Sequence, residues 1–442
     1  MGMRIRRGIE LPKDDFINMT IGILGAGYVG LATAAGFAAR GFEVICGDVN
    51  EEKIAILKEG KLPFFEKGML EVFAAASIPV VFSLDVALAC RCDVVFCCVG
   101  TPSAPDGSAD LSFVRSVALT CAEIAPNAVF VLKSTVPPGT SRAIAALVEG
   151  KLRVAANPEF LREGCAVEDA LKPSRVVIGA DDPSPFATSF AKATEVKKAS
   201  EGLPSVLSIL LDLYSGTGAP IVSTNTITAE MVKYASNSFL ATKISFINDM
   251  ANLCDVVGAD VLAVAEGMGL DDRIGAKFLQ PGPGYGGSCF PKDVKALMHL
   301  GASVGVPLRI LEATAAINDE RQMLPYRHLR ERLGDIRGKR IAIWGLAFKP
   351  GTDDVRDAPA LRIIEQCLAD GAMVIVYDPL VRQESMKQFP MVEFADSAHS
   401  ALVDTHALVV MTDWPEFSDH RLYDIEARVS SGVVIDLRFV LR

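Results

Sequence analysis

A glycine-rich turn close to the N-terminus constrains the fold of this chain more than any other feature of its sequence. In "GILGAGYVGLATA", Gly25, Gly27 and Gly30 have the spacing G-x-G-x-x-G, between a β-rich run and a run typical of a helix. Glycine at these positions permits a tight turn and lets a pyrophosphate approach the helix N-terminus. A lone match is weak, but its place between strand and helix predicts a dinucleotide-binding βαβ unit.

An acidic residue refines the prediction of the ligand. Asp48 ends the second β-rich run, about twenty residues after the turn. An aspartate there accepts hydrogen bonds from the adenosine ribose and repels the 2′-phosphate of NADP, so NAD is the predicted cofactor. A site for FAD or another nucleotide is the alternative.

From Thr20 to about Ile221, short β-rich runs alternate with helix-length segments. The runs are "TIGILG", "FEVICGD", "PVVFS", "DVVFCCVG", "AVFVLKS" and "LRVAAN". Such alternation predicts a doubly wound α/β domain with buried parallel strands.

The pattern changes after this domain and then returns. Residues 226–268 contain no strong helix breaker except two late glycines, which predicts a long helix or a helix pair. From Lys339 the α/β alternation resumes with "KRIAIWGLAFK", "AMVIVYD", "HALVVMTD" and "GVVIDLR". We therefore predict two Rossmann-type α/β domains, 19–223 and 331–442, joined by a helical segment, 224–330. Residues 1–18 are expected to form a disordered leader.

Composition excludes several classes of function. The net charge of −10 argues against nucleic-acid or anionic-membrane surfaces, and no uncharged apolar run is long enough to span a bilayer. The ten cysteines are scattered and no segment is typical of a secretory signal, which favours a cytoplasmic protein with free thiols.

Polar side chains follow several of the predicted strands. Thr101 lies in "VGTP", Ser134 and Thr135 lie in "STVPPGT", and "NPEFLREG" contributes Glu159 and Arg162. Ligands of open α/β sheets bind beyond the carboxyl ends of the strands, so we expect Thr101, Ser134 and Thr135 to contact the nicotinamide half or a water. Glu159, Arg162 and Glu163 are expected at the same rim. Ordinary turn chemistry is the alternative for each loop alone.

In "TAEMVKYASN", Glu230, Lys233 and Asn237 are spaced to share one face of a helix. A solvated polar stripe is the alternative. The other sides of this helix are apolar, and a lysine is rarely buried unpaired, which favours a cleft facing Lys233.

The stretch "GPGYGGSCFPKD", from Gly282 to Asp293, directs attention to one thiol. Pro291 suits the first turn of a helix, so Cys289 is expected at a helix N-terminus, where the dipole favours a thiolate. Lys292 adds positive charge, and Asp293 lies one turn on. This set indicates covalent catalysis, and the glycines are interpreted as clearance for a substrate and a nicotinamide.

The alternative for any cysteine is a small buried hydrophobe, which we favour for most of the other nine. Cys90, Cys92, Cys97 and Cys98 lie close together in "CRCDVVFCCVG". Adjacent residues of a strand point to opposite faces, so no metal site is predicted.

Five of these motifs occur in one order: "STVPPGT", "NPEFLREG", "EMVKYASN", "GGSCFPKD" and "GLAFKPGTDDVRDAP". Together with the glycine turn they make the chain, from Met19 to its C-terminus, resemble the UDP-glucose/GDP-mannose dehydrogenase family. The resemblance implies a helical dimerisation segment between the two α/β domains. It also implies NAD-dependent, four-electron oxidation of UDP-glucose at C6 to UDP-glucuronate, in nucleotide-sugar and polysaccharide biosynthesis.

The resemblance also implies roles for individual residues. Cys289 matches the nucleophile, Lys233 and Asn237 the substrate-side pair, and Asp293 the aspartate beside them. Glu159 and Thr135 match the residues that handle water. Matches to cofactor contacts are Gly25, Gly27, Tyr28, Val29, Gly30, Asp48, Lys53, Thr101, Ser134, Thr135, Glu163 and Lys292.

The same comparison implies a substrate site. Its matches are Phe160, Leu161, Arg162, Lys233, Asn237, Arg273, Phe278, Tyr285, Gly286, Phe290, Lys349 and Arg438. Arg273 corresponds to the arginine that family dimers lend to the neighbouring subunit, so a homodimer or a higher homo-oligomer is expected. The family's "EPGL" is "EKGM" here, and residues 181–204 are longer than expected; we interpret them as a solvated loop.

Other functions compete with this one. A dehydrogenase of GDP-mannose or of a UDP-N-acetylhexosamine would share the Cys, Lys, Asn and Asp set. β-Hydroxyacid dehydrogenases need neither the cysteine nor a third domain, and short-chain epimerases need a Tyr-x-x-x-Lys motif that this chain lacks. A binding protein that merely senses NAD or another nucleotide would not need the whole catalytic set.

Overall fold

The computed structural model describes residues 19–181 and 204–441. It forms two compact units. The first unit contains the residues up to 101 and residues 110–233, and the second contains residues 102–109 and the residues from 234 onward. The predicted leader, and nearly all of the segment 181–204, lie outside the described residues.

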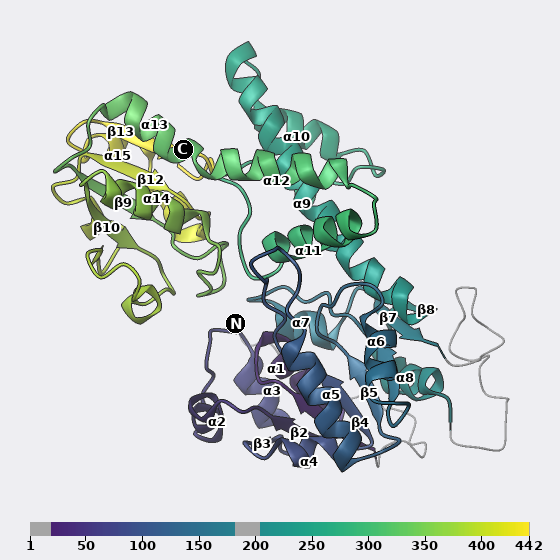
Figure 1. The fold of residues 1–442 in the computed structure, drawn as a ribbon. Coiled ribbons are helices and arrows are strands. Elements are labelled where there is room, and N and C mark those ends of the chain that lie inside the picture. The colour runs from purple at the N-terminus through teal and green to yellow at the C-terminus, as the bar shows by residue number, and fades with distance from the viewer. Residues whose placement is uncertain (1–18, 182–203, 442) are drawn as a thin grey trace. The chain divides into compact units, whose positions relative to one another are not determined.

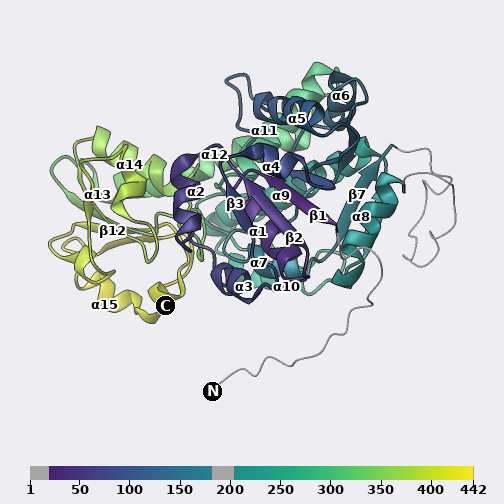
Figure 2. The ribbon, with the colours of Figure 1, turned by 90° about the horizontal axis from the view of Figure 1, so that it is seen from below.

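The first unit is built on an eight-stranded sheet with the order β3-β2-β1-β4-β5-β6-β7-β8 (Figures 1 and 2). Its strands are β1 (Thr20–Leu24), β2 (Glu43–Gly47), β3 (Val81–Ser83), β4 (Val94–Cys97), β5 (Val129–Leu132), β6 (Arg153–Ala156), β7 (Val176–Ala180) and β8 (Ile221–Thr224). The six predicted strands are confirmed as β1 to β6, and all the pairings among these six are parallel. Strand β7 runs antiparallel to β6 and parallel to β8.

Helices cover both faces of this sheet. They are α1 (Tyr28–Ala38), α2 (Glu51–Lys58), α3 (Met69–Ala75), α4 (Val86–Cys90), α5 (Ser112–Ile124), α6 (Thr140–Leu147), α7 (Ala166–Leu171) and α8 (Val206–Tyr214), with a 3₁₀ turn at Ser215–Thr217. One apolar core lies under α1, α2, α3, α7 and α8, and a second lies under α4, α5 and α6. Because both faces are buried, the strands are almost wholly apolar.

Helices dominate the next part of the chain. They are α9 (Thr226–Val257), α10 (Val261–Gly269), α11 (Phe290–Ser303), α12 (Arg309–Gln322) and α13 (Leu324–Leu333). The predicted helix pair is confirmed. Gly258 separates α9 from α10 with a φ of +77°, a conformation that favours glycine at the end of a helix.

A second parallel sheet, of order β11-β10-β9-β12-β13, completes the second unit. Its strands are β9 (Arg340–Trp344), β10 (Met373–Tyr377), β11 (Glu393–Phe394), β12 (Ala407–Val410) and β13 (Val433–Asp436). Helices α14 (Pro359–Ala369) and α15 (Leu422–Glu426) and 3₁₀ turns at Gln383–Met386, Ser400–Leu402 and Pro415–Asp419 surround it. The second Rossmann-type domain is therefore confirmed, with its own core.

Candidate active site

The glycine turn links β1 to α1 and leaves open space where a ligand would approach. Gly25 has a φ of +106°, and a Cβ at Gly30 would lie 1.7 Å from the oxygen of Gly25, so neither position accepts a side chain. A Cβ at Gly27, the N-cap of α1, would meet no atom within 4 Å. The turn therefore fits a pyrophosphate at the helix N-terminus.

Asp48 lies beside this turn. Its Oδ2 accepts a hydrogen bond from the Ala26 amide at 2.7 Å, and Lys53 Nζ lies 3.9 Å from the same oxygen. The ring of Tyr28 stacks on Phe64 with 3.7 Å between the ring centres. The carboxylate is thereby fixed at the end of β2, where it could also accept a ribose hydroxyl.

Two predicted loops meet at the ends of β4 and β5. Thr101 donates from Oγ1 to the Thr135 carbonyl at 2.9 Å, and Ser134 Oγ lies 2.6 Å from the Val99 carbonyl oxygen. The hydroxyls of Thr101 and Ser134 therefore hold the two loops together.

Lys233 and Glu159 form a buried ion pair in the first unit. Lys233 Nζ lies 2.7 Å from Glu159 Oε1, and the two side chains are 4% and 5% exposed. Burial opposes ionisation of Glu159, but the charge of Lys233 and its hydrogen bond outweigh it and lower the pKa of the carboxyl. Lys233 is therefore buried with a partner, and a cleft facing it stays a prediction.

The rest of the loop after β6 has mixed roles. Arg162 is bound to Asp169 with 2.7 Å between Nη2 and Oδ1, and its side chain is exposed. Phe160 packs under Arg175, whose guanidinium carbon lies 3.7 Å from the ring centre. Leu161 and Glu163 are half-buried.

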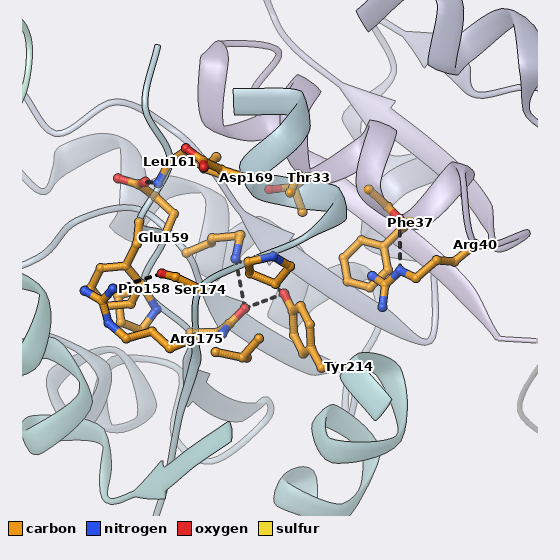
Figure 3. Close-up of a pocket in the computed structure, with 17 residues that line it drawn as sticks. Thr33, Phe37, Arg40, Pro158, Glu159, Leu161, Asp169, Ser174, Arg175 and Tyr214 are labelled. Carbon is orange, nitrogen blue, oxygen red and sulfur yellow. Dashed lines mark hydrogen bonds between the residues drawn. The ribbon is translucent and has the colours of Figure 1, made fainter. Parts of the chain in front are cut away.

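A cavity of about 60 Å³ lies beside the ion pair and includes Glu159 in its wall (Figure 3). A second buried lysine, Lys133, reaches this cavity and donates to Asn157 Oδ1 at 3.0 Å, and Tyr214 donates to the same oxygen at 2.6 Å. Sequence reasoning missed this network, because Lys133 and Asn157 merely end their strands in the sequence.

Glu230 does not face the same partners as its neighbours on α9. Its carboxylate accepts hydrogen bonds from the Gly139 and Ser141 amides at 2.6 and 2.7 Å, and from the Ser141 hydroxyl. It thus caps the N-terminus of α6. The capping role depends on the N-terminus of α6 lying close to Glu230 in the fold. The sequence alone does not show this proximity, so it could not separate the capping role from a catalytic one.

In the second unit, Cys289 is the N-cap of α11, as predicted. Its carbonyl accepts the first helical hydrogen bond from Asp293 at 3.0 Å, and the first turn contains Pro291. The thiol is half-buried, with Ser288 Oγ 3.5 Å away. Among the ten cysteines only Cys289 and Cys165 are not buried, and burial raises the pKa of Cys97 to about 12.

A fully buried carboxylate lies one turn along α11. Asp293 Oδ2 accepts a hydrogen bond from Asn237 Nδ2 at 2.7 Å, and Lys292 Nζ lies 2.5 Å from Oδ1. The structure therefore brings Asn237, Lys292 and Asp293 together. Among the described residues, no group of three or more His, Cys, Asp or Glu is arranged to hold a metal ion.

The segment from Gly282 to Ser288, here termed the glycine loop, corrects one interpretation. A Cβ at each of its four glycines would come within 3 Å of this chain's own atoms: Arg438 at Gly282, Asn318 at Gly284, Asp357 at Gly286 and Phe348 at Gly287. The interpretation of the glycines as clearance for ligands is therefore wrong, because protein atoms fill that space.

Aromatic residues surround the glycine loop. The ring of Phe290 lies 6.0 Å from that of Tyr285 and 6.2 Å from that of Phe278. Phe278 has a φ of +67°, which is strained for a bulky residue. Burial raises the pKa of the Tyr285 hydroxyl.

The remaining predicted substrate contacts are cationic. Arg273 is exposed and pairs with Asp271, with 2.6 Å between Nη2 and Oδ2. Arg438 donates from Nε to the Met411 carbonyl at 2.9 Å, and Lys349 Nζ lies 5.6 Å from the ring centre of Phe348.

A dinucleotide-type turn with its acidic residue, and a thiol beside a buried amide–carboxylate pair, define a nucleotide-dependent dehydrogenase. Three family models match the chain: the NAD-binding domain (residues 19–195), the central domain (227–320) and the UDP-binding domain (342–442) of the UDP-glucose/GDP-mannose dehydrogenase family. The chain belongs to this family, and its cofactor is NAD.

Relatives agree over nearly the whole chain. A UDP-glucose 6-dehydrogenase of Rhizobium meliloti is 42% identical over 96% of each chain. One of Bacillus subtilis is 40% identical over 95% of this chain and 88% of that protein. The structure of a UDP-glucose dehydrogenase from Pyrobaculum islandicum matches with a TM-score of 0.86 and 36% identity, over 98% of this chain and 96% of that one.

Proposed function

We propose that this protein is an NAD-dependent UDP-glucose 6-dehydrogenase, which oxidises the C6 alcohol of UDP-glucose to the carboxylate of UDP-glucuronate. Family membership and the names of the relatives support the substrate. The observation that carries the chemistry is the half-buried thiol of Cys289, at a helix N-terminus one turn from the Asn237–Asp293 pair.

The need for four electrons explains the need for a thiol. NAD, with its pyrophosphate and adenosine ribose at the open turn around Gly27 and Asp48, would supply the hydride acceptor through its nicotinamide ring. Once C6 is an aldehyde, its remaining hydrogen is not poised to leave as hydride until a nucleophile adds to the carbon. Cys289 Sγ forms a bond to C6 as the C=O double bond becomes a single bond, which gives a thiohemiacetal. Transfer of its C6 hydride to a second NAD would leave a thioester. Water then breaks the C–S bond, which yields the carboxylate and regenerates the thiol.

The other candidate residues have roles that suit their contacts. Lys233 and Asn237 lie one helical turn apart on α9 and supply N–H donors for the oxyanion at C6. Asp293 orients Asn237, because its carboxylate accepts the amide hydrogen bond. Glu159, ionised by its pairing with Lys233, would position the hydrolytic water with Thr135.

A panel of sugar nucleotides tests the substrate. UDP-glucose, UDP-N-acetylglucosamine, UDP-N-acetylmannosamine and GDP-mannose would each be assayed by absorbance at the NADH band. We expect kcat/KM to be highest for UDP-glucose by at least about a hundredfold. A higher value for any other member would reassign the substrate.

The variant Cys289→Ser tests the covalent route, with Cys165→Ser as the control because Cys165 is the exposed thiol of the chain. We expect uronate formation to fall by at least about a thousandfold in Cys289→Ser and to stay unchanged in the control. Uronate formed at the wild-type rate by Cys289→Ser would exclude the covalent route.

We also propose a homodimer formed through α9. Phe239, Phe246 and Leu253 recur every seventh residue along this helix and are 65%, 44% and 56% exposed. Exposed apolar residues at this spacing form a stripe suited to a partner helix. Sedimentation of the wild type and of Leu253→Glu tests this: a dimer that dissociates in the variant is expected, and a monomeric wild type would exclude it.

The division into domains at 19–223, 224–330 and 331–442 belongs to the same proposal, as does a cytoplasmic location. The free thiols of the described residues support a reducing compartment. Among the described helices, none is long and apolar enough to cross a bilayer.

A further inference from the structure

The C-terminal half of the glycine loop is packed tightly against the loop that follows β9. The Gly287 amide donates to the Arg356 carbonyl at 2.9 Å, and a Cβ at Gly286 would lie 2.1 Å from the Asp357 carbonyl oxygen. A Cβ at Gly287 would lie 2.8 Å from the ring of Phe348. Because Gly287 has no side chain, the Phe348 ring packs directly against the backbone of the glycine loop. A shift of the ring must therefore move the glycine loop, or the glycine loop must block the shift.

The N-terminal half of the loop is anchored differently. Asn248 accepts from the Gly282 amide at 2.8 Å, and Arg321 donates to the Gly282 carbonyl at 2.8 Å. Both side chains are almost fully buried. This end is fixed by helices α9 and α12, which hold it through buried polar groups.

The middle of the loop is held by α12 as well. Asn318 accepts from the Tyr285 amide at 2.7 Å and donates to the Tyr285 carbonyl at 3.1 Å, and Gln322 donates to the same carbonyl at 2.7 Å. The backbone is therefore fixed up to Tyr285. Orientation of the last residues before Cys289 depends on the contacts of Gly286 and Gly287 with the C-terminal domain.

Phe348 also borders a predicted nucleotide contact. It precedes Lys349, whose ammonium lies 5.6 Å from the centre of the Phe348 ring. Both residues lie in the part of the chain that matches the family's UDP-binding domain. A pyrophosphate bound by Lys349 would restrict the loop that follows β9. The Phe348 ring would transmit this restriction to Gly287, two residues before Cys289.

We propose that Phe348 is a positioning residue that couples occupation of the UDP site to the orientation of the Cys289 thiol. This inference rests on the proposed function, because it takes Lys349 to contact UDP and Cys289 to be the nucleophile. When a nucleotide is bound, the thiol is then confined to one orientation, directed at the sugar site and less open to a reagent from solution. When the site is empty, it samples more orientations.

Alkylation of Cys289 by iodoacetamide, measured with and without UDP, tests the coupling. UDP lacks the sugar, so it has no group that reaches for the thiol. The variants are Phe348→Ala and the conservative Phe348→Tyr, with Phe394→Ala as a control because Phe394 is a partly buried phenylalanine of the same C-terminal domain. Mass spectrometry of the Cys289 peptide gives the rate, and calorimetry gives UDP affinity for each variant.

We expect saturating UDP to slow alkylation of Cys289 at least threefold in the wild type, in Phe348→Tyr and in Phe394→Ala, by restricting the loop. In Phe348→Ala, UDP should still bind within about threefold of wild-type affinity, while the slowing disappears and kcat falls more than KM rises.

Other outcomes separate this inference from the proposed function. Equal slowing in the wild type and Phe348→Ala would mean direct shielding of the thiol and would overturn the coupling alone. UDP that binds the wild type without slowing alkylation of Cys289 would also overturn the coupling alone. This measurement uses only the wild type, so it does not depend on whether a variant folds. A wild type that does not bind UDP would overturn both the coupling and the proposed substrate.

Discussion

The two sheets of this protein begin with the same backbone arrangement. In the first, the Gly25 amide donates to the Gly47 carbonyl at 2.8 Å, and in the second the Gly345 amide donates to the Tyr377 carbonyl at 2.8 Å. Both glycines have positive φ angles, +106° and +89°. In each case the glycine after the first strand (β1 or β9) donates to the last residue of the neighbouring strand (β2 or β10).

An aspartate then holds each turn. Asp48 accepts from the Ala26 amide at 2.7 Å, and Asp378 accepts from the Leu346 amide at 2.8 Å. The Asp378 carboxylate has a further partner, because Trp414 donates to the same oxygen at 3.1 Å. The place where a dinucleotide's ribose would bind is thus occupied by protein in the second sheet.

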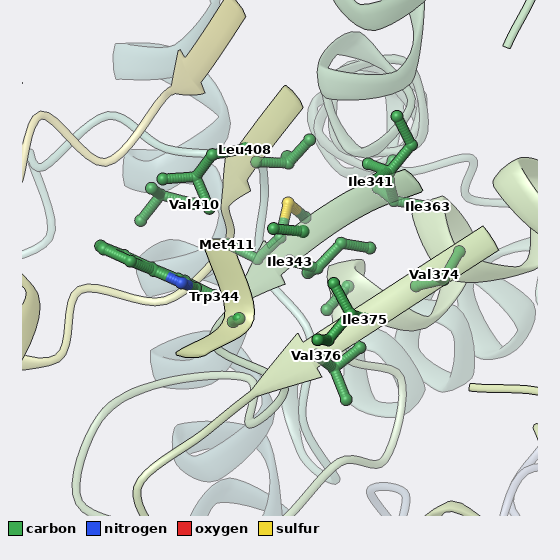
Figure 4. Packing of buried hydrophobic residues seen from close by; sticks show 14 of the residues in the cluster. Ile341, Ile343, Trp344, Ile363, Val374, Ile375, Val376, Leu408, Val410 and Met411 are labelled. Carbon is green, nitrogen blue, oxygen red and sulfur yellow. The ribbon is translucent and has the colours of Figure 1, made fainter. Parts of the chain in front are cut away.

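The space around the turns differs in the same sense. Helix α1 starts at Tyr28, directly after the first turn, whereas α14 starts at Pro359, after a long loop. A Cβ at Gly345 would lie 2.5 Å from that of Thr412, and one at its counterpart Gly25 would lie 2.7 Å from the Cys98 oxygen. Two residues after Gly25, however, Gly27 faces open space. Packing of the second sheet around Trp344 is shown in Figure 4. The open turn lies in the part of the chain that matches the family's NAD-binding domain, and the filled turn lies in the part that matches its UDP-binding domain.

The largest effect is expected from Asp378→Ala. This carboxylate accepts from the amides of Leu346, Ala347, Leu380 and Val381 and from the indole of Trp414. Because the loss leaves buried donors unpaired, the free energy of unfolding should fall by about 3–5 kcal/mol. NAD affinity should not change. Denaturant unfolding and NAD titration check both, and loss of NAD affinity in a folded variant would contradict the comparison.

Substitutions of two glycines, one in each turn, can be compared. Gly345→Ala should lower the free energy of unfolding by about 2–3 kcal/mol, because of its positive φ and the contact with Thr412. Gly27→Ala should change stability by less than about 1 kcal/mol, since it faces open space, yet weaken NAD binding by about tenfold. If calorimetry gave the same Kd for NAD with Gly27→Ala and with the wild type, the assignment of the NAD site to this turn would be wrong.

Asp48→Ala tests the choice of cofactor. The Asp48 carboxylate is expected to bind the ribose and repel a 2′-phosphate, so its loss should reduce the preference for NAD over NADP by about tenfold. The ratio of kcat/KM values for the two cofactors measures it. An unchanged ratio would show that another residue sets the preference.

A smaller effect concerns pH. The pKa of Glu159 is lowered in the folded protein, so its ionisation stabilises the fold above the unfolded-state pKa, near the ordinary value of 4.5 for a glutamate. This contribution is lost as pH falls through the folded-state pKa. The difference in unfolding free energy between wild type and Glu159→Gln should be constant at neutral pH and shrink below about pH 4.5. A difference that grows on acidification would contradict the assigned shift.

Much of the fold could be predicted from the sequence because its signals are local. Six apolar runs became β1 to β6, and Pro291 marked the start of α11. Strand β7 was missed although its "VVIGA" is apolar, and its antiparallel pairing with β6 is a tertiary choice that no local pattern encodes.

The sequence motifs named candidate site residues but did not predict which of them pair with one another. Lys233, Asn237 and Asp293 were identified from motifs, but the buried partner of Lys233 is Glu159, far away in the sequence. Glu230 has the same spacing as its neighbours on α9 and caps another helix instead. The glycines before Cys289 were misinterpreted, because which atoms fill the space next to a glycine depends on the fold.

The stoichiometry of NADH tests the central claim most directly. A limiting, known amount of UDP-glucose would be converted to completion by the wild-type protein with excess NAD, and NADH and UDP-glucuronate would both be measured. The proposed chemistry predicts two NADH and one UDP-glucuronate per UDP-glucose consumed. A single NADH per substrate, with an aldehyde as the final product, would contradict it.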